Sequence, residues 1–173
     1  MSLQNKNDNY LGNVNIKRDG VGHEWTEEQV KEYSTCMLDP VYFIEKYAKI
    51  ISLDKGLVSF KLYPYQKKMF KQFKDHRFNV VLACRQSGKS ISACGYLLWF
   101  ALFQPEKTVA VLANKGATAR EMLARITIML ENIPFFLQPG VKALNKSNID
   151  FSNNSRIIAA AVSYTHLTLP TIE

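Results

Sequence analysis

The residues best suited to chemistry lie together at 83–90, which reads ACRQSGKS. Gly-Lys-Ser ends the pattern GxxxxGK[ST], a loop whose backbone N–H groups face a polyphosphate. Gly88 would let the backbone approach closely, Lys89 would reach the β- and γ-phosphates, and the Ser90 hydroxyl would ligate Mg²⁺. The first glycine of the pattern is replaced by Ala83. The residues expected to contact phosphates are Cys84, Arg85, Gln86, Ser87, Gly88, Lys89 and Ser90.

Arg85 stands inside this loop, and its positive charge has two interpretations. An arginine supplied in cis to a γ-phosphate accelerates phosphoryl transfer in other enzymes by about 10³–10⁵-fold. A solvated charge or a structural ion pair would explain Arg85 equally well. The residues alone leave both interpretations open. Arg85 and Lys89 are the two candidate catalytic residues.

Tyr65 and Gln66, upstream of the loop, form a second candidate site. A glutamine amide can pair with the donor and acceptor edge of adenine, while an aromatic ring stacks on its face. Taken alone, the pair is better interpreted as a core tyrosine and a surface glutamine. Their place ahead of a phosphate loop favours nucleotide binding.

Basic side chains outside the loop indicate an anionic partner. Residues 61–90 hold eight Lys and Arg against one Asp, a charge of +7 that equals the net charge of the chain. Asn114 and Lys115 follow an expected strand and could touch DNA or simply end that strand. A lysine stripe that could contact DNA phosphates or form a solvated helix face comprises Lys67, Lys68, Lys71 and Lys74.

The sequence predicts a strand directly before the loop at 83–90 and a helix directly after it. Residues 79–82 are short and apolar, and 91–103 form a mostly apolar helix that Pro105 ends. This register favours a phosphate loop over a chance Gly-Lys-Ser. Further strands are expected at 57–62, 108–113, 148–151 and 156–161, and helices at 26–36, 39–47, 64–75 and 117–132. The alternation predicts a three-layer α/β fold with a parallel sheet.

Two of the helix starts carry capping signals. Thr26 followed by Gln29 fits a capping box, with Trp25 placed as a hydrophobic staple. Asp39 before Pro40 fits an N-cap with proline at the first helical position.

Length and composition restrict the class of protein. The 173 residues, 47% of them apolar, suit one domain with a real core and argue against general disorder. Three cysteines at neither disulfide nor zinc spacing, no apolar stretch long enough for a bilayer and no secretory signal predict a soluble intracellular protein. Residues 1–24 have little periodicity and are expected to be a flexible lead-in.

Several segments together closely resemble the ATPase domain of large terminase subunits from tailed bacteriophages, which are viral DNA-packaging motors. They read LYPYQ, RFNVVLACRQSGKS and TVAVLANKGATAREML, and DPVYFIEKY also resembles that family's N-terminal helices. The resemblance covers residues 25–161. It implies that they are the N-terminal part of an incomplete P-loop NTPase domain of the RecA/helicase-like kind.

The resemblance also implies function. ATP and Mg²⁺ would be the cofactors, and hydrolysis in the intact protein would drive double-stranded DNA into a procapsid. Ala83 is then normal for the family, Arg85 resembles its cis-acting arginine, and Tyr65 and Gln66 resemble its adenine-binding pair. Residues 114–118 resemble a segment akin to motif Ia of helicases. The implied partners are the portal and the small terminase subunit, with an oligomer on the portal in the host cytoplasm.

Part of the family pattern is absent from this sequence. The family continues to an apolar strand ending in Asp-Glu, which holds Mg²⁺ and activates water, and then to an RNase H-like nuclease domain. No apolar run ending in Asp-Glu occurs here, so we expect phosphate binding but poor ATP hydrolysis. Residues 162–173 resemble read-through of a sequencing adapter and are expected to be a non-native tail, with a real terminal strand as the alternative.

Two other functions remain open on the sequence. A helicase-like P-loop translocase shares the glutamine and the loop. A non-enzymatic DNA-binding module would use the lysine stripe, and its salt-sensitive binding would be indifferent to Lys89→Ala.

Overall fold

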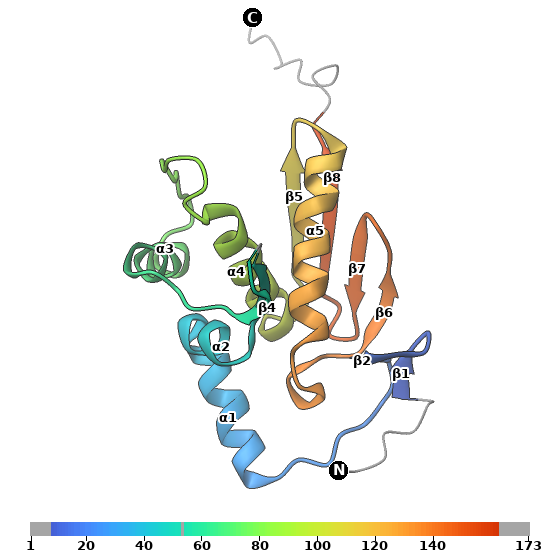
Figure 1. The fold of residues 1–173 in the computed structure, drawn as a ribbon. Coiled ribbons are helices and arrows are strands. Elements are labelled where there is room, and N and C mark those ends of the chain that lie inside the picture. Colours follow the sequence, from blue (N-terminus) through green and yellow to red (C-terminus); the bar gives the residue numbers. More distant parts are fainter. Residues whose placement is uncertain (1–7, 53, 163–173) are drawn as a thin grey trace, which may run out of the picture.

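Four strands between residues 108 and 161 form one sheet, called the central sheet below, on the right-hand side of Figure 1. The structure is a computed structural model that describes residues 8–52 and 54–162. The strand order is β5 (Thr108–Ala113), β8 (Arg156–Ala161), β7 (Asn148–Phe151) and β6 (Val141–Leu144). The α/β class is confirmed, as are the strands expected at 108–113, 148–151 and 156–161.

The sheet is mixed, and the expectation of a parallel sheet is wrong. Only β5 and β8 run parallel, with Thr108 opposite Arg156, whereas β8–β7 and β7–β6 are antiparallel. The connections explain the difference. Short turns at 145–147 and 152–155 can only reverse the chain, whereas a long crossover that contains a helix separates β5 from β8.

Helices cover one face of this sheet in the described part of the chain. The buried residues of the parallel pair alternate along each strand and are Val109, Val111, Ile157 and Ala159. On the other face Leu112 is 60% exposed. Helix α5 (Gly116–Glu131) packs on β5 and β8, and α4 (Lys89–Phe103) packs on α5. The three layers expected from the sequence are therefore not seen among the described residues.

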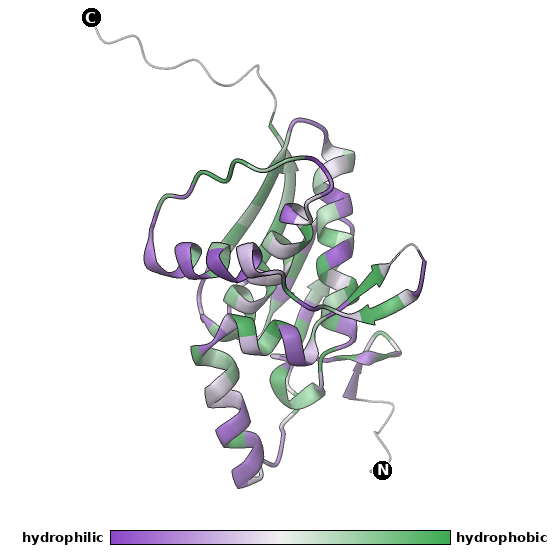
Figure 2. Cartoon of the chain, turned by 60° about the vertical axis from the view of Figure 1, so that its left-hand side comes forward, coloured by the Kyte–Doolittle hydropathy of each residue, from purple (hydrophilic) through white to green (hydrophobic). Residues whose placement is uncertain are grey.

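The strand expected at 79–82, directly before the phosphate loop, is not formed. These residues belong to a long segment between α3 and α4, visible as a largely green loop in Figure 2. Val80 is 98% exposed and Leu82 is fully exposed. Strand propensity is realised only against a neighbouring strand, and this segment pairs with none among the described residues.

The helices were predicted well because their ends are set by local signals. Helix α1 (Glu27–Leu38) begins with the expected capping box, in which Thr26 Oγ1 accepts from the Gln29 N–H and the Gln29 side chain accepts from the Thr26 N–H. Asp39 caps α2 (Pro40–Tyr47) by accepting from Val41 and Tyr42 N–H groups. Helix α3 (Pro64–Asp75) has the expected bounds.

The strand expected at 57–62 is confirmed in its first half only, as one strand of a separate hairpin. Strand β3 (Lys49–Ser52) pairs antiparallel with β4 (Gly56–Ser59), and neither joins the central sheet. The sequence analysis had not identified β3. This hairpin brings Ile50 and Ile51 towards the phosphate loop.

The lead-in expected at 1–24 is structured where it is described, from residue 8 onwards. Strands β1 (Asn9–Tyr10) and β2 (Asn13–Lys17) pair, and Ile16 is fully buried. Gln138, just after the 3₁₀ turn η2 (Phe135–Leu137), accepts from the Lys17 N–H and donates to the Asn15 carbonyl. The polar composition concealed this anchor because few apolar residues hold the hairpin: Ile16 is buried, and hydrogen bonds of Tyr10, Asn13 and Gln138 do the rest.

The tail expected at 162–173 lies outside the described residues apart from Val162, whose N–H donates to the Ala113 carbonyl. Within residues 8–52 and 54–162, none of the helices has the length and apolar character needed to cross a bilayer.

Candidate functional site

The loop at 84–88 leads directly into α4, so Lys89 and Ser90 are the first two residues of that helix. Gly88 is the N-cap and has φ +77°, a left-handed conformation that glycine adopts without a steric penalty. Gln86 also has positive φ, at 61°. The helix spans 15 residues, and its unpaired N–H groups and dipole favour an anion in front of the loop.

Two side chains of the loop converge on one backbone oxygen. The Cys84 carbonyl accepts from Ser87 Oγ at 2.9 Å and from Lys89 Nζ at 3.0 Å. The Lys89 ammonium therefore lies over the loop that precedes it. Arg85 and Ser90 are exposed, and neither side chain makes a hydrogen bond or ion pair within the part of the chain that the structure describes.

Tyr65 and Gln66, predicted from the sequence as a second candidate site, lie against the end of the loop. The Tyr65 phenol donates to the Ser87 carbonyl. A Cβ added at Gly88 would stand 2.8 Å from Gln66 Nε2, so a larger residue would displace the Gln66 amide in addition to straining φ. A cavity of about 450 Å³ separates the α3 turn, the β3–β4 hairpin and the loop.

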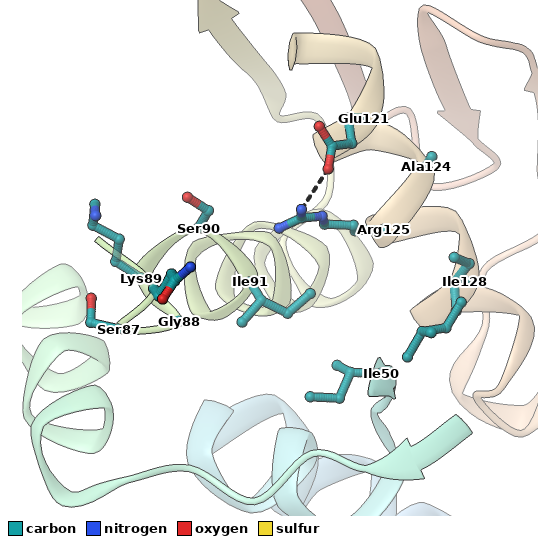
Figure 3. A pocket seen from close by; sticks show the side chains of 12 residues that line it. Ile50, Ser87, Gly88, Lys89, Ser90, Ile91, Glu121, Ala124, Arg125 and Ile128 are labelled. Carbon is teal, nitrogen blue, oxygen red and sulfur yellow. Dashed lines mark hydrogen bonds and ion pairs between the residues drawn. The ribbon is translucent and has the colours of Figure 1, made fainter. Parts of the chain in front are cut away.

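A larger cavity, of about 760 Å³, lies on the α5 side of the same loop (Figure 3). Its apolar wall is formed by Ile50, Ile51, Ile91, Ala124 and Ile128. On α5, Arg125 Nη2 pairs with Glu121 Oε1 at 2.6 Å, and Figure 3 shows this pair between α5 and the first turn of α4. The cavity is thus mostly apolar, with polar groups at the loop and on α5.

The sequence pattern did not indicate that Glu121, Arg125 and Ile50 lie beside the loop. The i,i+4 spacing of Glu121 and Arg125 is a readable helix pair, but such pairs usually lie on a solvated face. Only the packing of α5 and β3 around α4 brings them to this cavity.

Acidic ligands for a metal are scarce beside Ser90. In residues 8–52 and 54–162 there is no cluster of three or more His, Cys, Asp or Glu suited to hold a metal. Glu121 is the acidic residue that lines the larger cavity, and it is paired with Arg125. A divalent cation at the start of α4 would take the Ser90 hydroxyl as its protein ligand.

The lysine stripe of α3 is divided by the structure. Lys67 Nζ pairs with Glu45 Oε2 at 2.8 Å, and Lys74 Nζ donates to the Leu38 carbonyl at 2.8 Å. The hydrogen bond from Lys67 lowers the pKa of the Glu45 carboxyl, which also accepts from the Leu62 N–H. Lys68 and Lys71 stay exposed, so only half of the stripe is free of structural contacts in the described chain.

Asn114 and Lys115 lie at the carboxyl end of β5, as expected, and both are exposed. The parallel strand β8 ends beside them, where Val162 donates to the Ala113 carbonyl. Arg120 lies close by, with its guanidinium 3.1 Å from a Cβ added at Gly116.

The chain matches the model of a known protein family. The model described as terminase large subunit, T4likevirus-type, N-terminal, matches residues 80–168, which is just over half of the chain. The matched stretch contains the loop at 84–88, helices α4 and α5 and the whole central sheet. Tyr65 and Gln66 lie outside it.

Proposed function

Because the chain belongs to the family of T4likevirus-type terminase large subunits and matches their N-terminal part, we propose that its loop at 84–90 binds the phosphates of Mg-ATP. The observation that best supports this proposal is the geometry at the junction between the loop and α4. Gly88 in a left-handed conformation turns the chain into α4, which places Lys89 and Ser90 at the helix start. This junction combines backbone N–H groups, a helix dipole and an ammonium, the parts that an anion site needs.

The roles proposed for the loop residues follow from their chemistry. Lys89 would exchange the Cys84 carbonyl for a phosphate oxygen, because a charged acceptor binds an ammonium more strongly than a neutral one. The Ser90 hydroxyl would ligate Mg²⁺, which supplies charge neutralisation on the phosphates when bound. Arg85 is exposed at the loop and would reach the γ-phosphate in cis.

The finer fold assignment is also part of the proposal. A parallel pair joined by a crossover through α5, with α4 packed on α5, supports a RecA/helicase-like P-loop domain. In this proposal residues 79–82 become a strand only when a neighbouring strand lies beside them. Their strong exposed apolar character supports this assignment.

At the level of the intact protein, we propose an ATPase that translocates double-stranded DNA into procapsids, as an oligomer on the portal with the small terminase subunit, in the host cytoplasm. The family membership supports this role. The chain itself has no apolar run ending in Asp-Glu. It should therefore bind Mg-ATP and hydrolyse it poorly, because the sequence lacks the Asp-Glu pair that would hold Mg²⁺ and activate water.

The test is nucleotide binding by the 1–173 chain and by Lys89→Ala. We expect Lys89→Ala to weaken binding of Mg-ATP at least ten-fold, since it removes a charge-assisted contact to phosphate. Lys107→Ala is the matched control, because Lys107 is an exposed lysine directly before the first residue of β5 and does not belong to the loop. Equal affinities of Lys89→Ala and the unaltered chain would refute the proposed site.

The alternative of a non-enzymatic DNA-binding module has less support. Two of the four lysines of the stripe are held by Glu45 and Leu38, which leaves Lys68 and Lys71 for phosphate contacts. If the alternative holds, Lys68→Ala and Lys71→Ala should each weaken DNA binding and reduce its salt dependence, whereas Lys89→Ala should do neither.

A further inference from the structure

The first turn of α3 lies directly against the end of the phosphate loop. The Tyr65 phenol donates to the Ser87 carbonyl, and a Cβ added at Gly88 would lie 3.9 Å from Tyr65 Oη. The same Cβ would lie 2.8 Å from Gln66 Nε2. Residues 76–82, which connect α3 to the loop, are exposed throughout. On its α3 side the loop is therefore held by the side chains of Tyr65 and Gln66. The exposed residues 76–82, which precede the loop, give it little support.

The groups that Tyr65 and Gln66 could offer to a base are partly used in this arrangement. Gln66 is 2% exposed, and its Oε1 accepts from the Tyr63 N–H at 2.9 Å. The Tyr65 ring stacks on the Tyr63 ring, with centroids 5.9 Å apart and an interplanar angle of 9°. One ring face and the amide oxygen are therefore occupied unless the first turn of α3 rearranges.

The hydrogen bond to Ser87 also sets the direction of the next amide. The peptide bond between Ser87 and Gly88 is trans, so its C=O and N–H point in opposite directions. With the carbonyl turned towards Tyr65, the Gly88 N–H points away from α3. Backbone N–H groups are the donors with which such a loop binds an anion, so Tyr65 presets one of them.

We propose that Tyr65 is a positioning residue whose hydroxyl orients the Ser87–Gly88 peptide for phosphate binding. This role, and not stacking on a base, is its main contribution to nucleotide affinity. The inference rests on the proposed function, because it requires a polyphosphate at the loop.

The test compares Mg-ATP with magnesium tripolyphosphate, which carries the phosphates without a base, by isothermal titration calorimetry. Tyr65→Phe keeps the ring and removes the donor. It should weaken both ligands by the same factor, about three- to ten-fold, the worth of one hydrogen bond. Tyr63→Phe is the matched control and should leave both affinities unchanged, because the Tyr63 phenol makes no hydrogen bond within the described chain.

Amide hydrogen exchange of the chain without ligand gives a second measurement. Tyr65→Phe should speed exchange at 86–90, where the loop loses its support, and leave α5 and the melting temperature unchanged. A purely structural role of Tyr65 would instead speed exchange in α5 and lower the melting temperature.

The possible failures are distinguishable. If Tyr65→Phe weakens ATP but not tripolyphosphate, Tyr65 acts on the base and the inference is wrong. It is equally wrong if neither affinity nor loop exchange changes. If Lys89→Ala binds both ligands as the unaltered chain does, the proposed function itself fails.

Discussion

Lys89 Nζ lies 3.0 Å from the carbonyl oxygen of Cys84, so the first side chain of α4 folds back over the loop that precedes it. The Ser87 hydroxyl donates to the same oxygen. Both donors would favour a phosphate oxygen over a neutral carbonyl, because the phosphate is charged. The Cys84 carbonyl therefore occupies the position at which a phosphate oxygen would accept from Lys89 and Ser87.

Cys84 should be the reactive thiol of the chain. It is exposed, whereas Cys36 and Cys94 are fully buried. Burial raises the pKa of the Cys36 thiol to about 12 and that of the Cys94 thiol to about 11, which suppresses the reactive thiolate near neutral pH. N-Ethylmaleimide should modify Cys84 first, and Mg-ATP should slow that reaction. Peptide mapping by mass spectrometry would show the order, and early labelling of Cys36 would contradict it.

Gly88→Ala should damage both folding and binding. The residue has φ +77°, and the new Cβ would stand 2.8 Å from Gln66 Nε2. Strain of this kind costs about 1–3 kcal/mol, so we expect a lower free energy of unfolding and loss of Mg-ATP binding. Gly22→Ala is the matched control, since a Cβ there meets nothing within 4 Å. Chemical denaturation of the two variants measures the difference, and equal stabilities would show that the loop relaxes freely.

Glu32 should make the contact between α1 and α2 sensitive to acid. Burial alone would raise the pKa of its carboxyl, but hydrogen bonds from Lys46, Tyr47 and Tyr42 outweigh that effect and lower it. A lowered folded pKa means that the stabilisation is present above the unfolded value, near 4.5, and is lost as pH falls through the folded value.

The corresponding variant is Glu32→Gln. Because these groups are partly exposed, it should cost only about 1 kcal/mol at neutral pH, and the difference should disappear in acid. Glu24→Gln, at an exposed position without a partner in the described chain, should leave the pH profile of unfolding unchanged. A Glu32→Gln deficit that persists at pH 3 would rule out this origin.

Gln138 should be needed to hold the N-terminal hairpin. Its amide is 2% exposed and donates to the carbonyls of Asn15, Leu130 and Ile133. Gln138→Ala removes the side-chain donor to the Ile133 and Asn15 carbonyls and the acceptor of the Lys17 N–H, so we expect a loss of about 2–3 kcal/mol in the free energy of unfolding. Gln72→Ala, on the exposed side of α3, should cost almost nothing. Protease cleavage before residue 18 should become faster in Gln138→Ala alone.

The features of this protein that depend on residues close together in the chain, namely helix starts and the loop before α4, could be predicted from the sequence. Thr26 and Asp39 set two helix starts because capping needs only groups a few residues apart. The Gly-Lys-Ser at the start of α4 identified the loop for the same reason, and Gly88 has the conformation that its residue type permits. The terminase family was also predicted, from the segments LYPYQ, RFNVVLACRQSGKS and TVAVLANKGATAREML, and the family match confirms it.

Only the tertiary structure decided what depends on neighbours distant in sequence. Residues 79–82 have the composition of a strand, yet they remain unpaired in the described chain because a strand requires a partner. The sequence made Lys67 a candidate for contact with DNA phosphates, whereas in the structure its ammonium pairs with Glu45 at 2.8 Å. Arg125 reaches the cavity beside the loop only through the packing of α5 on α4. The local sequence does not show which distant residue a charged side chain or a strand will pair with. Their roles are therefore decided by burial and pairing in the folded chain.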